Sequence, residues 1–351
     1  MTTAEMSNSS RSAKVTVAAV VEETSDARSL VFEVPSDRVD EFAYKPGQFL
    51  TLRVPSDQTG SVARCYSLAS SPFTDDLPKV TIKRTMGGYA SHWLCDNVEV
   101  GDVIEVLPPA GVFTPPNFDD DLLLFAAGSG VTPVISILKS ALSQGAGKVV
   151  MVYANRDEKS VIFARELAEL TALHGGRLTV IHWLESLQGL PSADQLACLV
   201  AGFNDRRVFM CGPKPFMDTV HEATARAGFP RNRVHAEVFT SLSGDPFADV
   251  VLPELTEEEA GDAATVSVTL DGEAHEYNWP RSSTLVDVLL SKGIDVPFSC
   301  REGECGSCAC TLVDGKVDMG NSSILDDDDI ADGYILACQA RPISDHLNVE
   351  F

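Results

Sequence analysis

Residues 300–310 read CREGECGSCAC, and a further cysteine, Cys338, follows at a distance. Four residues separate Cys300 from Cys305, two separate Cys305 from Cys308, and 29 separate Cys308 from Cys338. Four thiolates at this spacing hold a [2Fe–2S] cluster. We therefore predict that these four cysteines are metal ligands and that the chain around them folds as a small domain wrapped on the cluster.

The loop between these cysteines is rich in small residues. Gly303, Gly306 and Ser307 leave room for the backbone to wrap a cluster and to direct N–H groups at its sulfurs. A four-cysteine zinc site is the alternative, but such sites usually carry two CxxC pairs and only one is present. Cys310 lies two residues beyond a ligand, and we predict that it is a buried thiol rather than a ligand.

The remaining cysteines and the N-terminus indicate the cellular compartment. The chain has nine cysteines, an odd number, and its first residues lack the basic start and apolar core of a secretory signal. These features argue against a disulfide framework and predict a cytoplasmic protein. The longest apolar stretch, residues 122–138, is broken by Gly128, Gly130 and Pro133 and is too short to span a bilayer.

The charge of the chain is acidic and unevenly distributed. The 351 residues carry a net charge of −24, with 44% hydrophobic and 22% charged residues, as in soluble globular proteins. From Pro246 onward there are 22 acidic and five basic residues, a net of −17, against −7 for residues 1–245. This predicts an acidic C-terminal module, disfavours nucleic acid and anionic membranes as partners, and favours a partner with a basic docking face. Solubility alone is the alternative explanation of the acidity.

Residues 12–115 form the first predicted domain. Short alternating apolar runs, such as 15–21 and 29–34, are separated by glycine and proline, which predicts an antiparallel barrel or sandwich. A helix from Ser91 to about Asn97 interrupts the strands.

Residues 116–240 show a different pattern, in which apolar strands alternate with helices. This alternation predicts a doubly wound parallel sheet. We expect strands at 121–130, 149–156, 178–184 and 207–213, and helices at 133–142, 165–170 and 215–227.

Residues 241–263 contain serine, glycine, proline and an acidic run, which predicts a linker. Residues 264–351 form the third predicted domain, which carries the cysteine loop. It is expected to begin with a hairpin around Asp271-Gly272 and to continue into an amphipathic helix over 283–292.

Two short motifs on the predicted barrel suit a flavin. In Arg64-Cys65-Tyr66-Ser67-Leu68, an arginine, an aromatic ring and a hydroxyl are available for the phosphate, the ring and the N5 region of a flavin. In Gly88-Tyr89-Ala90-Ser91, Ser91 is expected to cap a helix whose free N–H groups and dipole attract a phosphate. A surface arginine, a core tyrosine and an ordinary helix cap are the alternatives for each motif alone.

Two turns of the second domain suit a dinucleotide. Ala127-Gly128-Ser129-Gly130-Val131-Thr132-Pro133 follows its first strand, and glycines there allow the backbone to approach a pyrophosphate at a helix N-terminus. A plain strand–helix turn is the alternative, because Pro133 stands where the third glycine of GxGxxG belongs. Cys211-Gly212-Pro213 ends a later strand of the same sheet, where open parallel sheets bind ligands.

The order RCYSL, GYAS, AGSGVTP, CGPKPFM and HAEVF resembles the ferredoxin–NADP reductase superfamily, and CREGECGSCAC with Cys338 resembles a plant-type ferredoxin fused behind it. The resemblance covers residues 12–351 and implies a flavin-binding β-barrel, a nucleotide-binding domain and a β-grasp ferredoxin domain. This layout is similar to that of reductase components of multicomponent oxygenases. Stretches such as KRTMGGYASHWLCDN and GYILACQARP most resemble reductases of 3-ketosteroid 9α-hydroxylases, and reductases of the phenylacetyl-CoA epoxidase type share the layout.

The resemblance implies roles for individual residues. It implies that FAD rather than FMN is bound and that Ser67, Cys211 and Glu237 act at the site of hydride transfer. It implies that a larger set binds the cofactors, namely Arg64, Tyr66, Ser67, Leu68, Lys83, Gly88, Tyr89, Ala90, Ser91, Gly128, Gly130, Thr132, Pro133, Gly212, Pro213 and Phe239. Phe239 stands where an aromatic residue covers the flavin in many family members.

The resemblance therefore implies an electron-transfer reductase. NADH delivers two electrons as a hydride to FAD, and the [2Fe–2S] cluster passes single electrons to a separate Rieske-type terminal oxygenase, of the 3-ketosteroid 9α-hydroxylase system. Another multicomponent oxygenase, of the phenylacetyl-CoA epoxidase or aromatic-ring type, and a ferredoxin-like carrier with a degenerate nucleotide domain are the alternatives. Arg156 follows the second parallel strand, where it could bind the 2′-phosphate of NADPH. The residues alone therefore do not favour NADH, and the preference for NADH is implied by the resemblance alone.

Overall fold

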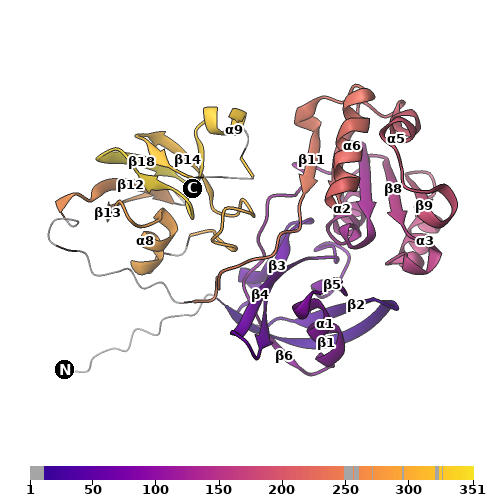
Figure 1. Cartoon of the computed structure of the whole chain (residues 1–351), viewed down its shortest axis with the longest axis horizontal. Helices are drawn as coiled ribbons and strands as arrows, with labels where there is room; N and C mark the ends of the chain where they lie inside the picture. The colour runs from indigo at the N-terminus through magenta and orange to yellow at the C-terminus, as the bar shows by residue number, and fades with distance from the viewer. Residues whose placement is uncertain are drawn as a thin grey trace. The chain divides into compact units, whose positions relative to one another are not determined.

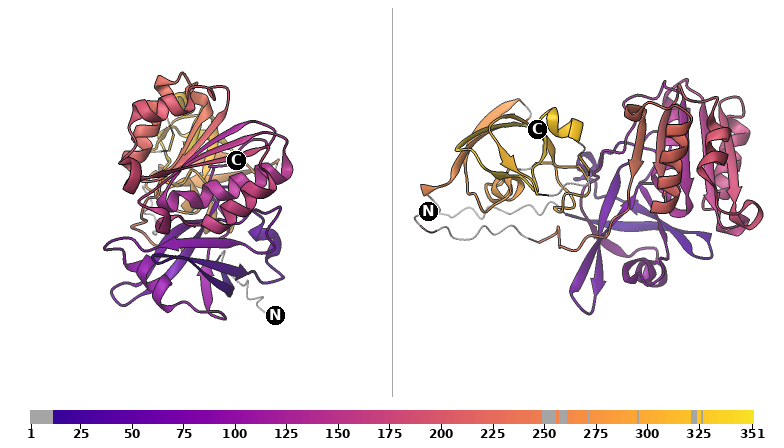
Figure 2. Two further views of the ribbon diagram at one scale, coloured as in Figure 1. Left: turned by 90° about the vertical axis from the view of Figure 1, so that its right-hand side faces the viewer. Right: turned by 45° about the horizontal axis from the view of Figure 1, so that its top comes forward.

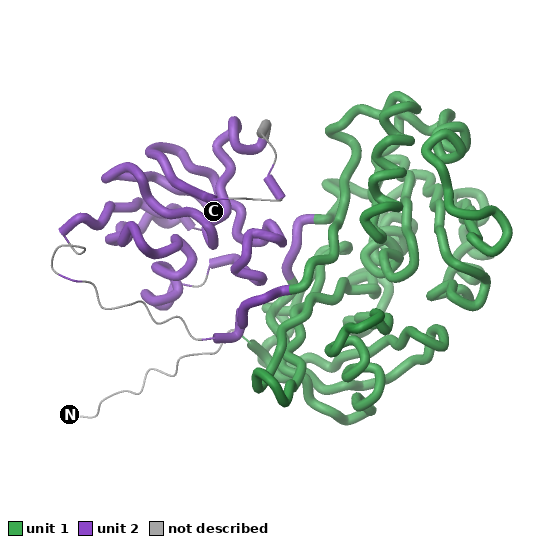
Figure 3. The backbone as a smooth tube through the Cα atoms, viewed as in Figure 1, with its two compact units in different colours: residues 1–109, 113–241 green, residues 110–112, 242–351 purple. Residues whose placement is uncertain are grey.

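The computed structural model describes residues 12–248, 256, 261–270, 272–294, 296–320, 324–325 and 327–351. The chain divides into two compact units (Figure 3): residues 1–109 with 113–241, and residues 110–112 with 242–351. Residues 1–11 and the acidic residue Asp326 lie outside the described residues.

The first sheet of unit 1 is antiparallel and curls so that its edges meet (Figure 1). Its strands are β1 (Ala13–Thr24), β2 (Ala27–Glu33), β3 (Phe49–Ser56), β4 (Gly60–Ser67), β5 (Lys79–Lys83) and β6 (Val103–Val106), in the order β4-β3-β6-β1-β2-β5. A bridge between Leu68 and Val80 joins the chain just beyond β4 to β5. Helix α1 (Tyr89–Asn97) packs on this sheet, and a short 3-10 turn, η1 (Val39–Phe42), precedes β3. The predicted antiparallel barrel-type domain is confirmed.

The second sheet of unit 1 is fully parallel, with the order β11-β10-β7-β8-β9. Figure 2 shows helices on both of its sides. The strands are β7 (Leu122–Ala127), β8 (Val149–Asn155), β9 (Leu178–Leu184), β10 (Arg207–Cys211) and β11 (Val234–Glu237). The helices are α2 (Val131–Gln144), α3 (Ala164–Leu173), α4 (Glu185–Gln188), α5 (Ala193–Val200) and α6 (Lys214–Arg226), with 3-10 turns η2 (Gly128–Gly130), η3 (Glu158–Ser160) and η4 (Arg231–Arg233).

Strand β7 shows why this sheet is apolar on both faces. Successive side chains of a strand point to opposite faces. Leu122 and Leu124 pack with α2 and α3, whereas Leu123 and Phe125 pack with α5 and α6. The continuous apolar sequence of β7 is therefore the signature of a sheet covered on both sides, and the predicted doubly wound domain is confirmed.

A buried polar cluster joins the two sheets of unit 1. Lys139 of α2, only 5% exposed, places its Nζ 2.9 Å from a carboxylate oxygen of Asp75 and 2.7 Å from one of Glu166. The hydroxyl of Ser136 donates to the backbone oxygen of Ser70 at 2.6 Å. A buried charge is tolerated only when paired, so these contacts hold α2 against the loop that follows β4.

Unit 2 contains a mixed sheet with the order β13-β12-β18-β14-β16, in which β12 and β18 run parallel and the other pairs antiparallel. Its strands are β12 (Ala264–Leu270), β13 (Glu273–Trp279), β14 (Ala309–Asp314), β16 (Tyr334–Leu336) and β18 (His346–Glu350), with a small pair β15 (Val317–Asp318) and β17 (Arg341–Pro342). Helix α8 (Leu285–Ser291) packs on the sheet, and α9 (Asp327–Ala331) precedes β16. This is the predicted β-grasp arrangement.

Several element boundaries differ from the predicted ones. Helix α1 begins at Tyr89 rather than Ser91, and α2 begins at Val131 rather than Pro133, because the preceding glycine turns lead directly into each helix. Helix α5 and strand β11 were not predicted. β11 has only four residues, and its pairing with the buried β10 stabilises it. Of the predicted linker, residues 249–255 and 257–260 lie outside the described residues.

Replacing Gly130 by alanine is expected to destabilise unit 1. A Cβ at this position would lie 2.2 Å from the backbone oxygen of Cys211, and backbone cannot rotate away as a side chain does. Overpacking of this kind costs about 1–3 kcal/mol, which corresponds to roughly 2–4 °C in melting temperature for each kcal/mol. Thermal unfolding followed by circular dichroism measures the effect. Gly202→Ala is the control, because a Cβ there meets nothing within 4 Å. Equal melting temperatures for the two variants would contradict the argument.

Candidate flavin, nucleotide and cluster sites

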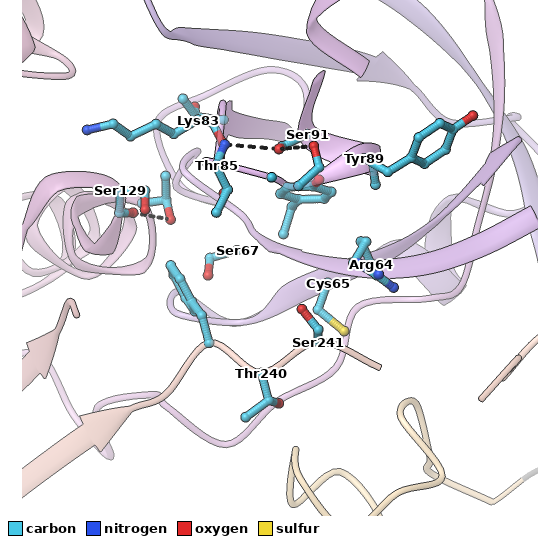
Figure 4. Close-up of a pocket in the computed structure, with 17 residues that line it drawn as sticks. Arg64, Cys65, Ser67, Lys83, Thr85, Tyr89, Ser91, Ser129, Thr240 and Ser241 are labelled. Atoms are coloured by element: carbon cyan, nitrogen blue, oxygen red, sulfur yellow. Dashed lines mark hydrogen bonds between the residues drawn. The ribbon is translucent and has the colours of Figure 1, made fainter. Parts of the chain in front are cut away.

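A cavity of about 530 Å³ opens between the barrel and the parallel sheet of unit 1. In Figure 4, Arg64 and Tyr89 lie toward one end of the cavity, and Lys83 and Ser129 lie toward the other. The lining comes from β4, β5, the start of α1, the turn before α2 and the segment after β11. Its residues are Arg64, Cys65, Tyr66, Ser67, Thr81, Lys83, Thr85, Gly87, Gly88, Tyr89, Ala90, Ser91, Ser129, Thr132, Phe239, Thr240 and Ser241.

The end of β4 supplies three chemically different groups to this cavity. Arg64 brings a permanent cation, Tyr66 an aromatic ring and Ser67 a hydroxyl group. Burial raises the pKa of the Tyr66 hydroxyl, so this side chain stays neutral at ordinary pH. A cation, a flat apolar face and a hydrogen-bonding group in one elongated cavity fit the phosphate, ring and polar edge of a flavin.

The start of α1 forms part of the same cavity, but Ser91 does not cap the helix as predicted. Gly88 is the N-cap residue, and no side chain caps the first turn. The Ser91 hydroxyl instead accepts a hydrogen bond from the backbone N–H of Thr85 at 3.0 Å, which fixes the preceding turn. Because Gly88 makes no side-chain capping hydrogen bond to the first turn of α1, the N–H groups of that turn are available to a phosphate.

A second cavity, also of about 530 Å³, lies at the carboxyl ends of β7, β8, β9 and β10. Open parallel sheets bind ligands at this edge, where the strand order reverses between β7 and β10. We call it the nucleotide cleft. Its lining residues are Lys83, Ala127, Gly128, Ala154, Asn155, Arg156, Trp183, Glu185, Leu190, Pro191, Pro213, Pro215, Phe216 and Thr219.

The glycine turn after β7 lies between the two cavities. Gly128 lines the nucleotide cleft, whereas Ser129 and Thr132 line the flavin cavity. The Thr132 hydroxyl donates to the backbone oxygen of Ser129 at 3.0 Å and fixes the turn. Gly130 faces the backbone of Cys211, so the two turns predicted to bind the nucleotide lie against each other.

Lys83 is the cation common to both cavities. A Cβ on Gly128 would lie 3.5 Å from the Lys83 ammonium, so this group is placed beside the glycine turn. Burial lowers the pKa of Lys83, while Asp26, whose carboxylate is 3.9 Å away, opposes that shift.

Cys211 and Glu237 are neighbours on paired strands β10 and β11. Cys211 is fully buried, and burial together with the nearby Glu237 carboxyl raises the pKa of its thiol. Burial also raises the pKa of Glu237 to about 7. Neither residue lines the flavin cavity, whereas Phe239, two residues beyond Glu237, does.

Four predicted cofactor-binding residues line neither cavity. Leu68 lies in the barrel core, Pro133 is buried within α2, and Gly130 and Gly212 pack against neighbouring backbone or side chains. The structure adds residues that the sequence analysis did not select, chiefly Trp183, Glu185 and Phe216. Trp183 lies at the end of β9, Glu185 directly follows it, and Phe216 follows β10. Once the strand order is known, the rule that open parallel sheets bind ligands at the carboxyl ends of their strands points to these residues.

The four predicted metal ligands converge in unit 2. The Cys300 sulfur lies close enough to those of Cys305 and Cys338 to interact with both, and Cys308 likewise interacts with Cys338. The backbone N–H of Glu302 donates to the Cys300 sulfur at 3.4 Å. Four soft sulfur donors with N–H groups directed at them fit a [2Fe–2S] cluster.

The surrounding residues support the same interpretation. Gly303 has φ of +78°, which a side chain would strain, and this turn carries the loop between Cys300 and Cys305. The amide of Gln339 donates to the Cys338 sulfur at 3.5 Å. Cys310 lies apart, with its thiol directed at the backbone oxygen of Ile335 in the domain core, as predicted.

Comparison with known proteins identifies the family. Residues 14–114 match an oxidoreductase FAD-binding domain, residues 124–222 an oxidoreductase NAD-binding domain, and residues 268–342 a 2Fe-2S iron-sulfur cluster binding domain. The ferredoxin reductase component of 3-ketosteroid-9-alpha-monooxygenase from Rhodococcus rhodochrous is 68% identical over the whole of both chains. The chain belongs to this ferredoxin reductase family. The predicted FAD, NAD and [2Fe–2S] cofactors are thereby confirmed.

Other members of the family share the full layout. The corresponding component from Mycolicibacterium smegmatis is 57% identical over 95% of this chain and 96% of its own. A subunit of the 1,2-phenylacetyl-CoA epoxidase from Escherichia coli is 31% identical over 96% of this chain and 97% of its own. The structure of phthalate dioxygenase reductase superposes with a TM-score of 0.56 at 25% identity, covering 96% of this chain and 97% of that one. In the part of the ferredoxin reductase chain that the structure describes, none of the helices has the length and apolarity needed to cross a membrane.

Replacing Cys305 or Cys308 by serine is expected to remove the cluster but not the flavin. Both thiols belong to the sulfur group of unit 2, whereas the flavin cavity lies entirely in unit 1. Iron and acid-labile sulfide analysis and visible spectra should show cluster loss with FAD retained, and nicotinamide should still reduce the flavin. Cys198→Ser, which alters an exposed thiol on α5, is the control. Retention of two irons by the Cys305 and Cys308 variants would contradict the assignment.

Proposed function

We propose that this protein takes electrons from NADH and supplies them to a Rieske-type terminal oxygenase that hydroxylates 3-ketosteroids at the 9α position. The observation that carries the proposal is 68% identity to such a reductase component along the entire length of both chains. The shared layout of flavin cavity, nucleotide cleft and sulfur group supports electron transfer through all three sites. We further propose a cytoplasmic location and domain limits at 12–115, 116–240 and 264–351.

The flavin cavity supports specific roles for its residues. The Arg64 cation and the N–H groups at Gly88–Ser91 hold the FAD phosphates, and the Tyr66 ring packs against the flavin ring. The Ser67 hydroxyl, which Figure 4 shows directed into the cavity, lies toward the N5 edge and donates or accepts there. Phe239 covers the exposed ring face and excludes water until the nicotinamide replaces it.

The nucleotide cleft supports the binding of a dinucleotide beside that flavin. The turn at Gly128–Gly130 and the N-terminus of α2 receive the pyrophosphate, with Lys83 as its cation. Cys211, which is buried against the Gly130 turn, and its neighbour Glu237 support the nicotinamide end of the site without lining either cavity. Bound FAD supplies the conversion of one hydride into two single electrons, which the cluster carries.

Supply of a different oxygenase is the second candidate. The support for it comes from more distant relatives, such as the phenylacetyl-CoA epoxidase subunit, whose 31% identity is about half that of the 3-ketosteroid reductase component. The test is NADH oxidation by this protein in the presence of purified terminal oxygenases. The 3-ketosteroid oxygenase should yield hydroxylated steroid at a rate tied to NADH consumption. Equal or faster coupling to an aromatic-ring or acyl-CoA oxygenase would overturn the proposal.

Glu237 is expected to give flavin reduction a pH dependence centred near pH 7. Burial raises the pKa of Glu237 from 4.5 to about 7, so the carboxyl is neutral below that pH and ionised above it. The ionised form stabilises the positive charge that develops on the nicotinamide as it loses hydride, so the rate should rise with pH. Stopped-flow absorbance measures the profile. The Glu237→Gln variant should lose the inflection, whereas Glu169→Gln, an exposed residue of α3, should keep it. An inflection retained in Glu237→Gln would assign it elsewhere.

Electron transfer to the oxygenase is expected to slow as salt rises. The net charge of −17 from Pro246 onward is carried by the linker together with the module that hands over electrons, and salt screens such charges over roughly 8 Å at physiological ionic strength. Reduction of a small neutral dye should change much less. Replacing the four aspartates at 326–329 by asparagine should weaken the salt dependence if that acidic run faces the partner. Asp327–Asp329 form the start of α9. A partner reaction that is indifferent to salt would leave the acidity as a solubility feature.

A further inference from the structure

Asp26 lies in the tight turn between β1 and β2 of the barrel, far in sequence from the nucleotide-binding turns. Its position is well defined. The hydroxyl of Thr24 donates to one carboxylate oxygen of Asp26 at 2.7 Å, and the backbone N–H of Arg84 donates to the Asp26 backbone oxygen at 2.8 Å. The other carboxylate oxygen is therefore held in a fixed direction.

That second oxygen meets two cations of the nucleotide cleft. It lies 3.1 Å from Nη2 of Arg156 and 3.9 Å from Nζ of Lys83. Arg156 directly follows Asn155, the last residue of β8, and all three of these cleft residues line the cavity. Asp26, a residue of the barrel, therefore adds a negative charge beside the cations of the nucleotide cleft, although it does not line the cleft itself.

The cleft near Arg156 has the character of a ribose site. Asn155 is 8% exposed, and neither atom of its side-chain amide makes a hydrogen bond of normal geometry to any described residue. Glu185 lines the same cleft from the first position after β9. An amide and a carboxylate offer donors and acceptors to sugar hydroxyl groups, and buried polar groups of this kind require a partner.

The cations of this region are balanced by carboxylates. Lys83 and Arg156 supply two positive charges, and Asp26, Glu185 and Asp157, which interacts with Lys83, supply three negative ones. The pyrophosphate that all nicotinamide dinucleotides share needs only one cation at the glycine turn, which Lys83 provides. A 2′-phosphate adds about 1.5 to 2 further negative charges, and the guanidinium suited to it is already paired with Asp26.

We infer that Asp26 is a specificity-determining residue, which engages Arg156 in an ion pair and thereby selects NADH against NADPH. This inference rests on the proposed use of NADH as electron donor. Exposed ion pairs contribute little to folding, so the pair is not explained by stability: Arg156 is 66% exposed. The pair matters for binding instead: it occupies the Arg156 guanidinium, which would otherwise form charge-assisted hydrogen bonds with the 2′-phosphate.

The test is Asp26→Asn, which keeps an acceptor for Thr24 and removes the charge. Stopped-flow reduction of bound FAD gives second-order rate constants for NADH and NADPH. Calorimetry with NADP⁺ gives a dissociation constant that does not depend on turnover. The ratio of NADPH to NADH rate constants should rise about three- to fivefold, and NADP⁺ should bind tighter by a similar factor, because the ion pair that is released is exposed and therefore weak.

Two further variants complete the experiment. In Asp26→Asn/Arg156→Ala the gain should disappear, because Arg156 is the group released. Asp96→Asn is the matched control, since it breaks another barrel ion pair, to Arg84 at 2.6 Å, with the same change of charge. The flavin spectrum verifies that each variant is folded and loaded.

The outcomes separate this inference from the proposed function. An unchanged ratio in Asp26→Asn, a gain that persists in the double variant, or an equal gain in Asp96→Asn would overturn the role of Asp26. Equal wild-type rate constants for NADH and NADPH would instead contradict the proposed NADH preference. The effect of Asp26 would still be measured, as the difference in the NADPH to NADH ratio between the wild type and Asp26→Asn.

Discussion

The ion-paired lysine at the junction of the two sheets is the contact on which the flavin site depends. Lys139 of α2 is buried between Asp75, from the loop after β4, and Glu166, from α3. Lys139 itself is 5% exposed, so its charge requires these partly exposed carboxylates, and the pairing favours one arrangement of the barrel against the sheet. This matters because the flavin cavity is lined from both sides and would lose its shape if either side moved.

Close backbone contact plays the corresponding part in the nucleotide cleft. Gly130 leaves no space between the turn after β7 and the turn after β10, so the two turns form one surface. Lys83 then lies beside that surface and lines both cavities, so that one cation is shared by the proposed flavin and nucleotide sites. The residues around it are arranged for positioning and charge balance, while the redox chemistry belongs to the cofactors.

The cluster domain follows a different physical logic. Its four sulfurs come from one short loop and one later residue, and their surroundings provide N–H donors and turns rather than a lined cavity. Such a site depends on local backbone conformation. Its strongly acidic composition adds a long-range property, because charge on this scale influences how a partner approaches without requiring a defined pocket.

The sequence by itself determined the three kinds of domain, and it predicted the four clustered cysteines and most residues of the flavin cavity and the glycine turn, because these depend on spacing within a few residues or on strand and helix periodicity. Only the tertiary structure decided which residues meet across long intervals. The Asp26–Arg156 pair spans 130 positions and joins a barrel turn to a strand end. Three further features also depend on contacts between separate elements. They are the hydrogen bond of Ser91 to Thr85, the burial of Leu68 in the barrel core, and the position of Lys83 between the two cavities. Each depends on how two elements pack, and packing depends on the side chains of both, which no local pattern contains.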